Sequence, residues 1–211
     1  MATRLLVLSP KGGSGKSTIC RNIAAVAAED GLAVGVLDTD DQGTLAKWGG
    51  TRQRHSDLPA ISVHFCPLSQ LDEVETPEGL GLFIIDTPTA IEAYPAQVKA
   101  LIESADLVLV PTQPTADDVG SVMPIMAMLQ DSRKPSAFVV NRVRPRVLEV
   151  EAARRELGAV GPVIAASLPD SVEIQRAMMD GKGITETAGK GQAEMRAIWR
   201  EIARMIERQH G

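Results

Sequence analysis

The chain has 211 residues, of which 44% are hydrophobic, 23% charged and 3% aromatic, and its formal net charge is −5. This length suits one sizeable α/β core, and the composition is ordinary for a globular protein. The negative charge excludes a uniformly basic nucleic-acid binder, so any DNA contact needs a local basic patch. The few aromatic side chains argue against recognition of single strands by stacked bases.

Apolar runs alternate with helical segments along the chain. We predict strands at 4–8, 33–38, 62–66, 82–86, 107–111, 136–141 and 162–165. Helices are predicted at 17–30, 43–54, 95–104, 117–130, 148–157, 171–180 and 192–209. Several strands are continuous apolar runs, which is typical of parallel strands covered on both faces. The predicted fold class is therefore α/β: a single domain, 1–211, with a doubly wound, mostly parallel sheet, helices on both faces and ligand at the C-terminal strand ends.

A glycine-rich loop with the sequence KGGSGKST, residues 11–18, lies between the first strand and the first helix. Glycines let backbone N–H groups approach phosphates closely, Lys16 would reach the β- and γ-phosphates, and the Ser17 hydroxyl would ligate Mg²⁺. Pro10 stands where the usual motif has glycine, and Lys11 adds a second lysine. Because one lysine is enough for a triphosphate within one chain, the second suggests charge supplied to another chain's nucleotide. The alternative is a simple turn.

Five segments together resemble the ParA/MinD family of deviant Walker A ATPases, in the small form without an N-terminal helix-turn-helix. They are KGGSGKST at 11–18, DTDDQ at 38–42, FIIDTP at 83–88, VPTQPT at 110–115 and VVNR at 139–142. The resemblance implies a P-loop NTPase fold and a slow, partner-stimulated ATPase that uses ATP and Mg²⁺. It also implies a homodimer with ATP, non-specific binding to double-stranded DNA, and a ParB-like partner. The cargo would be a plasmid, a chromosome or a protein cluster.

Carried over from the family, Lys11 contacts the phosphates of the other subunit, Asp40 positions the attacking water, and Asp38 coordinates Mg²⁺ through water. Asp86, at the end of an apolar strand, is the expected anchor of the Mg²⁺ site. The predicted catalytic residues are Lys11, Lys16 and Asp40, and the predicted metal residues are Ser17, Asp38 and Asp86. The predicted nucleotide-binding residues are Lys11, Gly12, Gly13, Ser14, Gly15, Lys16, Ser17, Thr18 and Asn141. The alternatives are an exposed lysine, solvated loop acids and a turn-capping Asp86.

Two loop features remain open at this level. Asp41 replaces a proline that the family usually has, which adds negative charge and loosens the loop. Asn141 would suit the adenine edge, although a turn-forming residue at a strand end is the alternative. Pro111 and Pro114 would shape a switch-like loop, or simply a turn.

Cysteine use and hydropathy predict a cytoplasmic protein, and the family resemblance implies that it associates with the nucleoid. Cys20 and Cys66 are expected to be core thiols in a reducing compartment. No signal peptide precedes the first strand, and no apolar run approaches the roughly 20 residues of a membrane span.

Two basic patches are candidates for DNA binding. One is the cluster of Arg142, Arg144 and Arg146, and the other is the stripe of Arg196, Arg200, Arg204 and Arg208 on the final helix. The alternative for the stripe is a solvated face with arginines paired to nearby glutamates. Two rival functions are a MinD-like membrane-positioning ATPase that uses the final helix, and a nucleotide-dependent metabolic enzyme or metal-cluster carrier.

Overall fold

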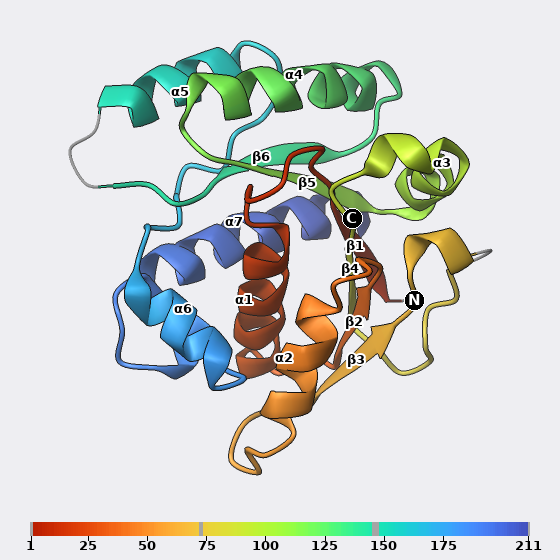
Figure 1. The fold of residues 1–211 in the computed structure, drawn as a ribbon, viewed down its shortest axis with the longest axis vertical. Helices are drawn as coiled ribbons and strands as arrows, with labels where there is room; N and C mark the ends of the chain where they lie inside the picture. The colour runs from red at the N-terminus through yellow and green to blue at the C-terminus, as the bar shows by residue number, and fades with distance from the viewer. Residues whose placement is uncertain (1, 72–73, 145–147, 211) are drawn as a thin grey trace.

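The computed structural model describes residues 2–71, 74–144 and 148–210 (Figure 1). Six parallel strands form one sheet in the order β3-β2-β4-β1-β5-β6. The strands are β1 (Thr3–Val7), β2 (Val34–Asp38), β3 (Ile61–Phe65), β4 (Leu82–Asp86), β5 (Leu107–Thr112) and β6 (Ser136–Val140). The predicted doubly wound α/β fold is confirmed.

Helices cover both faces of the sheet, as Figure 1 shows. One face carries α1 (Lys16–Glu29), α2 (Thr44–Arg52), α6 (Val172–Met179) and α7 (Gln192–His210). The other carries α3 (Pro95–Ser104), α4 (Ala116–Asp131) and α5 (Leu148–Gly158). Single turns of 3₁₀ helix, which the periodicity does not predict, are η1 (Leu68–Gln70), η2 (Ile91–Ala93) and η3 (Ile184–Glu186).

The alternation of side chains along each strand produces two cores. In β1, Leu5 and Val7 pack against the α1 side, whereas Leu6 packs against the α4 side. All three are fully buried, since strands in the middle of a parallel sheet have helices on both faces. This explains the continuous apolar runs of the sequence.

The predicted seventh strand at 162–165 is wrong. This segment runs beside β6 and forms one isolated bridge, Phe138 to Val163. It exchanges two hydrogen bonds with Phe138, from Phe138 N to Pro162 O and from Ile164 N to Phe138 O. Pro162 has no N–H to extend the ladder, so the pairing stays too short for a strand.

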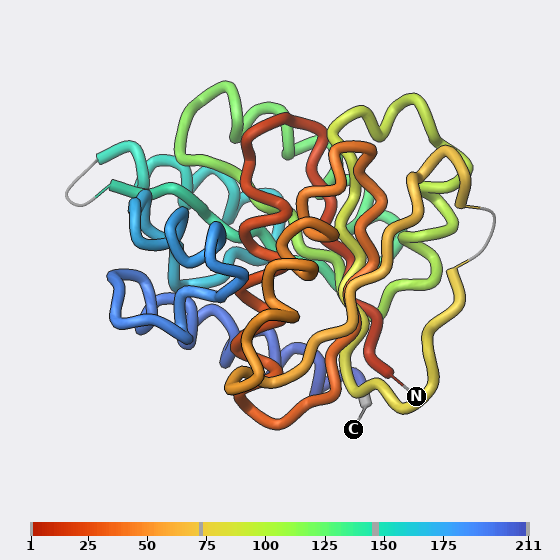
Figure 2. Tube along the Cα trace, turned by 60° about the horizontal axis from the view of Figure 1, so that its bottom comes forward, coloured from red at the N-terminus to blue at the C-terminus, as the bar shows by residue number. Residues whose placement is uncertain are grey.

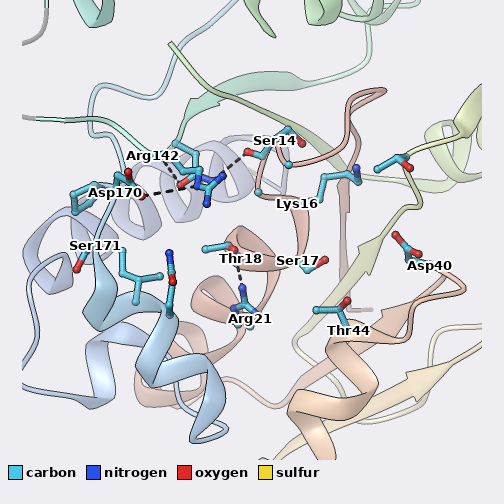
Figure 3. Close-up of a pocket in the computed structure, with 17 residues that line it drawn as sticks. Ser14, Lys16, Ser17, Thr18, Arg21, Asp40, Thr44, Arg142, Asp170 and Ser171 are labelled. Carbon is cyan, nitrogen blue, oxygen red and sulfur yellow. Dashed lines mark hydrogen bonds and ion pairs between the residues drawn. The ribbon is translucent and has the colours of Figure 1, made fainter. Parts of the chain in front are cut away.

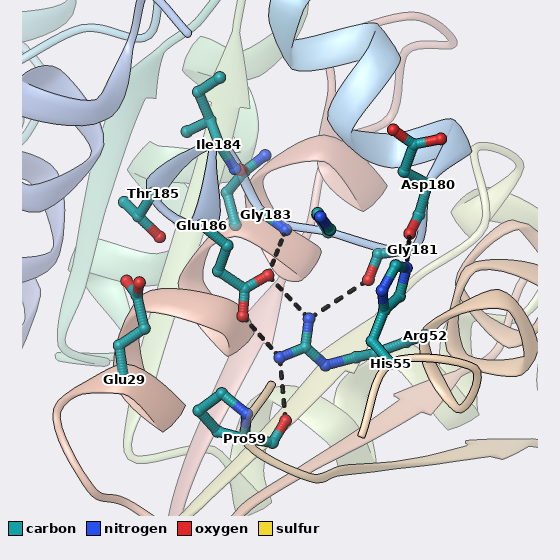
Figure 4. A network of polar contacts seen from close by, with 12 residues as sticks. Glu29, Arg52, His55, Pro59, Asp180, Gly181, Gly183, Ile184, Thr185 and Glu186 are labelled. Atoms are coloured by element: carbon teal, nitrogen blue, oxygen red, sulfur yellow. Dashed lines mark hydrogen bonds and ion pairs between the residues drawn. The ribbon is translucent and has the colours of Figure 1, made fainter. Parts of the chain in front are cut away.

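The C-terminal ends of the parallel strands bring distant loops together. Figure 2 shows the turn after β1 and the loop after β2 at the same end of the molecule, opposite the two termini. A buried network lies toward the opposite end, where α1 and α2 end and β3 begins (Figure 4). Arg52, at the end of α2, pairs with Glu186 in η3 at 2.6 Å, and both side chains are almost fully buried. The pair fastens α2 to the segment that follows α6.

Candidate nucleotide site

The loop between β1 and α1 has the backbone of a phosphate cradle. Gly13 and Gly15 have φ angles of 80° and 95°, a left-handed conformation that favours glycine. A Cβ atom on Gly15 would lie 1.7 Å from Nδ2 of Asn141, so a side chain does not fit there. The loop leads directly into the N-terminus of α1, where unpaired N–H groups bind anions.

Lys16 is folded back over this loop. Its Nζ atom donates hydrogen bonds to the carbonyl oxygens of Ser9, at 3.2 Å, and Lys11, at 3.5 Å. Burial lowers the pKa of Lys16, against the opposing effect of Asp86 and Asp40. A cation held by two neutral carbonyls is available to pair with a phosphate.

Asp86 ends β4 behind the loop and is fully buried. Neither carboxylate oxygen has a hydrogen-bond partner among the described residues. Burial raises the pKa of Asp86 to about 7, while the nearby Ser17 and Lys16 lower it. An orphaned buried carboxylate beside a serine hydroxyl is an oxygen donor set that fits Mg²⁺.

Asp38 and Asp40 have different surroundings, as their alternation predicts. Asp38 is fully buried, and its Oδ2 atom accepts from the N–H groups of Leu45, at 2.8 Å, and Ala46, at 3.0 Å. Burial raises the pKa of Asp38, and these backbone bonds lower it. Asp40 instead lines the cavity over the phosphate loop (Figure 3). Asp38 therefore anchors the start of α2; its role toward Mg²⁺ stays a prediction.

Comparison with known proteins agrees with this geometry. The model of the CobQ/CobB/MinD/ParA nucleotide binding domain matches residues 5–184. A maintenance of carboxysome distribution protein A from Gloeobacter kilaueensis is 31% identical over 96% of this chain and 93% of its own length. The chain belongs to the CobQ/CobB/MinD/ParA family.

Solved structures of ParA/MinD-type ATPases have the same fold. The septum site-determining protein MinD from Pyrococcus horikoshii, complexed with Mg-ADP, superposes with a TM-score of 0.73 at 15% identity, covering 99% of both chains. A variant of McdA from Cyanothece in complex with ATP gives 0.68 at 16% identity, covering 98% of this chain and 96% of that one. This ParA-type chain is an ATPase whose cofactors are ATP and Mg²⁺. Ser17 and Asp86 would hold the metal, which neutralises charge on the phosphates when bound.

Lys11, the second lysine of this ParA-type loop, lies outside its own nucleotide cavity, which Gly13–Thr18 line. Its Nζ atom pairs with Oδ1 of Asp118, on α4, at 2.9 Å, and the lysine side chain is 41% exposed. Gln113, in the loop before α4, donates to the carbonyl of Gly13 at 2.9 Å. The proline-containing loop thus contacts the phosphate loop directly.

The whole cavity has a volume of about 300 Å³. Its end beside Asn141 and Asp170, away from Lys16, is where a base and sugar would fit. Asn141 is buried there, donating from Nδ2 to Ser14 O at 3.1 Å and accepting at Oδ1 from the N–H of Arg142. Its side chain therefore fixes the phosphate loop, and its contact with adenine stays a prediction. Further wall residues, which sequence reasoning missed, are Arg21, Thr44, Thr89, Pro169, Asp170, Ser171, Ile174 and Gln175.

The loop that carries Asp41 is ordered without the family's proline. The N–H of Gly43 donates to Asp40 O at 2.8 Å, and the N–H of Gln42 donates to Asp40 Oδ1 at 2.9 Å. Asp41 is exposed at the tip of this turn. The hydrogen bonds that Asp40 accepts thus restrain this loop, as a proline ring would restrain its backbone.

The candidate DNA-binding arginines lie in two separate places. Arg142 and Arg144 pair with Asp170, at 4.0 and 3.4 Å, on the rim of the nucleotide cavity, and Arg146 lies outside the described residues. On α7, Arg196 pairs with Glu29 at 3.1 Å. The other arginines of the stripe, Arg200, Arg204 and Arg208, are exposed.

The cysteines differ from each other. Cys20 is fully buried in α1, and burial raises the pKa of its thiol well above the usual value. Cys66 is only half-buried, so its prediction as a core thiol is wrong in degree. It follows β3, the edge strand of the sheet, which pairs with β2 on one side. Residues at this edge are therefore less covered than those in the middle of the sheet.

Proposed function

We propose that this chain is a ParA-type positioning ATPase. ATP joins two chains face to face across their phosphate loops, and the dimer binds double-stranded DNA without sequence preference. A ParB-like partner bound to cargo stimulates hydrolysis, which releases the dimer from the nucleoid. The cargo is a plasmid, a chromosome or a protein cluster, and the name of the Gloeobacter relative supports a protein assembly.

The observation that carries this proposal is the position of Lys11. It lies on the phosphate loop, does not line its own cavity and is half-exposed. Gly12 and Gly13 beside it are exposed as well. A lysine that faces outward from a nucleotide site can neutralise charge on the nucleotide of a second chain, as an arginine finger does.

The stripe on α7 is the better candidate for DNA contact. Arg200 and Arg204 are exposed and have no ion pair within the described ranges. Arg196 contributes less, because Glu29 neutralises it. Arg142 and Arg144 both pair with one carboxylate, that of Asp170. The three side chains together therefore carry a net positive charge that a phosphate backbone could neutralise.

The structure does not favour the membrane alternative. The apolar face of α7, formed by Met195, Ile198, Trp199 and Ile202, is buried in the core. Among the described residues, no helix has the length and apolar character needed to span a bilayer. The amphipathic pattern of this helix is used for packing on α1.

The test compares Arg200→Gln/Arg204→Gln with the control Lys99→Gln, an exposed lysine of α3. We expect the wild-type chain to bind arbitrary duplex DNA with ATP, with affinity that falls steeply in salt. The double variant should lose at least tenfold in affinity while its ATP-dependent dimer persists. DNA binding equal to wild type would reject α7 as the DNA surface.

A further inference from the structure

Arg21, on the second turn of α1, carries a buried guanidinium beside the phosphate loop. The residue is 4% exposed and lines the nucleotide cavity. Its Nη2 atom donates to Oγ1 of Thr18 at 2.7 Å, the dashed line below the loop in Figure 3. Within the part of the chain that the structure describes, Nε and Nη1 have no hydrogen-bond partner. No described carboxylate forms an ion pair with this arginine either.

A buried, unpaired guanidinium destabilises a folded chain, because its charge loses water without gaining a partner. Burial lowers the pKa of Arg21 to about 10, so the group remains charged at neutral pH. Folding alone does not account for such a residue, since an apolar side chain would fill the same space at lower cost. An anionic ligand would supply the missing charge.

The direction of the side chain indicates which anion. Side chains of a helix point toward its N-terminus, so Arg21 reaches Thr18 on the first turn, where N–H groups bind phosphate. Because Thr18 Oγ1 accepts from Arg21, the hydroxyl proton is free to donate outward. Figure 3 shows Thr18 and Arg21 between the wall with Asp170 and Ser171 and the end with Lys16 and Asp40.

We infer that Arg21 is a positioning residue for the α-phosphate of the nucleotide. Lys16 and Ser17 lie at the end for the β- and γ-phosphates, and Asp170 and Ser171 lie at the base end. The phosphate between these ends is the α-phosphate. Arg21 holds the Thr18 hydroxyl toward it and adds positive charge from behind. This inference rests on ATP binding and not on the proposed DNA and partner functions.

The test measures the affinities of ATP and ADP, by titration calorimetry, and the melting temperature of the nucleotide-free chain. Arg21→Met should lose on the order of 10- to 100-fold in affinity for both nucleotides, the effect of one charge-assisted hydrogen bond. Its nucleotide-free melting temperature should not fall, whereas a merely structural arginine would lower it when removed. Arg21→Lys, which keeps the charge, should recover part of the affinity.

Thr18→Val provides a second, independent measurement. Its loss should be similar, and the double variant Thr18→Val/Arg21→Met should lose less than the product of the two single losses, because both act on one phosphate. ADP affinity within twofold of wild type in Arg21→Met would overturn the inference. So would a loss confined to ATP, which would place Arg21 at the γ-phosphate, or an Arg21→Met chain that does not fold.

Discussion

The Nζ atom of Lys11 lies 2.9 Å from Oδ1 of Asp118, so its own chain holds the lysine that the family carries across the dimer. Asp118 is buried at the first turn of α4, while the lysine is half-exposed. An ion pair of this exposure contributes little stability, about 0–1 kcal/mol. The contact is therefore easily exchanged for a phosphate of a second chain.

The first prediction concerns this exchange. Asp118→Asn should release Lys11 and lower the ATP concentration at which dimers form, by up to a few-fold. Asp117→Asn is the matched control, since Asp117 is exposed on the same helical turn and makes the same charge change. Light scattering after gel filtration measures the dimer. Equal curves for the two variants would show that Asp118 does not compete for Lys11.

Gly12→Val should bind ATP but fail to dimerise. Among the described residues of one chain, a Cβ atom on Gly12 would have Cγ2 of Thr89 as its one neighbour within 4 Å, at 3.8 Å, so the monomer tolerates it. Across a dimer a valine on this exposed loop would collide with its copy. Gly15→Val is the contrasting control and should lose ATP binding, because its Cβ overlaps Asn141. Normal ATP-dependent dimers of Gly12→Val would contradict the proposed interface.

Asp86 should make stability depend on pH when Mg²⁺ is removed. Its pKa is raised to about 7 in the folded chain, against about 3.9 when unfolded. The folded state therefore holds the proton more tightly, and stability falls as pH rises through this window and is lowest above pH 7. The full effect is on the order of 4 kcal/mol. Melting temperatures in a chelator at pH 5 and pH 8 measure the part between these pH values, about 2–3 kcal/mol.

The control for this effect is Asp86→Asn. It should abolish the pH dependence between pH 5 and 8, stabilise the nucleotide-free chain at pH 8 and prevent Mg²⁺-dependent hydrolysis. If the melting temperature of the variant changed with pH as much as that of the wild type, another group would be responsible for the pH dependence.

The pair of Arg52 and Glu186 should stabilise the fold and leave the ATPase chemistry unchanged. Two hydrogen bonds, at 2.6 and 2.8 Å, join the guanidinium to the carboxylate, and both residues are buried. Arg52→Met leaves a buried carboxylate unpaired and should cost about 3–5 kcal/mol in urea unfolding. Adding Glu186→Met should recover part of this loss. A single-variant loss below 1 kcal/mol would show that water reaches the pair.

Much of this fold was predictable, and the failures have physical causes. Strands buried on both faces, such as β1 and β4, have continuous apolar runs that predict them clearly. The spacing of the glycines in residues 11–18 predicts the phosphate loop. The segment at 162–165 has the same apolar pattern as a strand, yet Pro162 and its place beside edge strand β6 limit it to a bridge.

The site was predictable where a motif carries it. Lys16 and Ser17 line the cavity and Asp86 lies buried behind the loop, while their roles stay predictions. The cavity wall formed by Asp170, Ser171 and Ile174 belongs to no motif, because packing of α6 against α2 brings it to the loop. Arg21 was missed for a different reason: arginine on a helix is usually exposed, and only the structure shows it buried.

The most direct test of the account measures binding of Asp40→Ala to arbitrary duplex DNA with no nucleotide, ADP or ATP, with the molecular mass measured in parallel. Asp40 lines the cavity, so its removal should slow hydrolysis and preserve the ATP state. We expect a dimer and DNA binding with ATP alone, and we expect both to be lost with ADP. An ATP-bound dimer that does not bind duplex DNA of any sequence would contradict the proposed function. ATP-dependent dimerisation would then be the part that still holds.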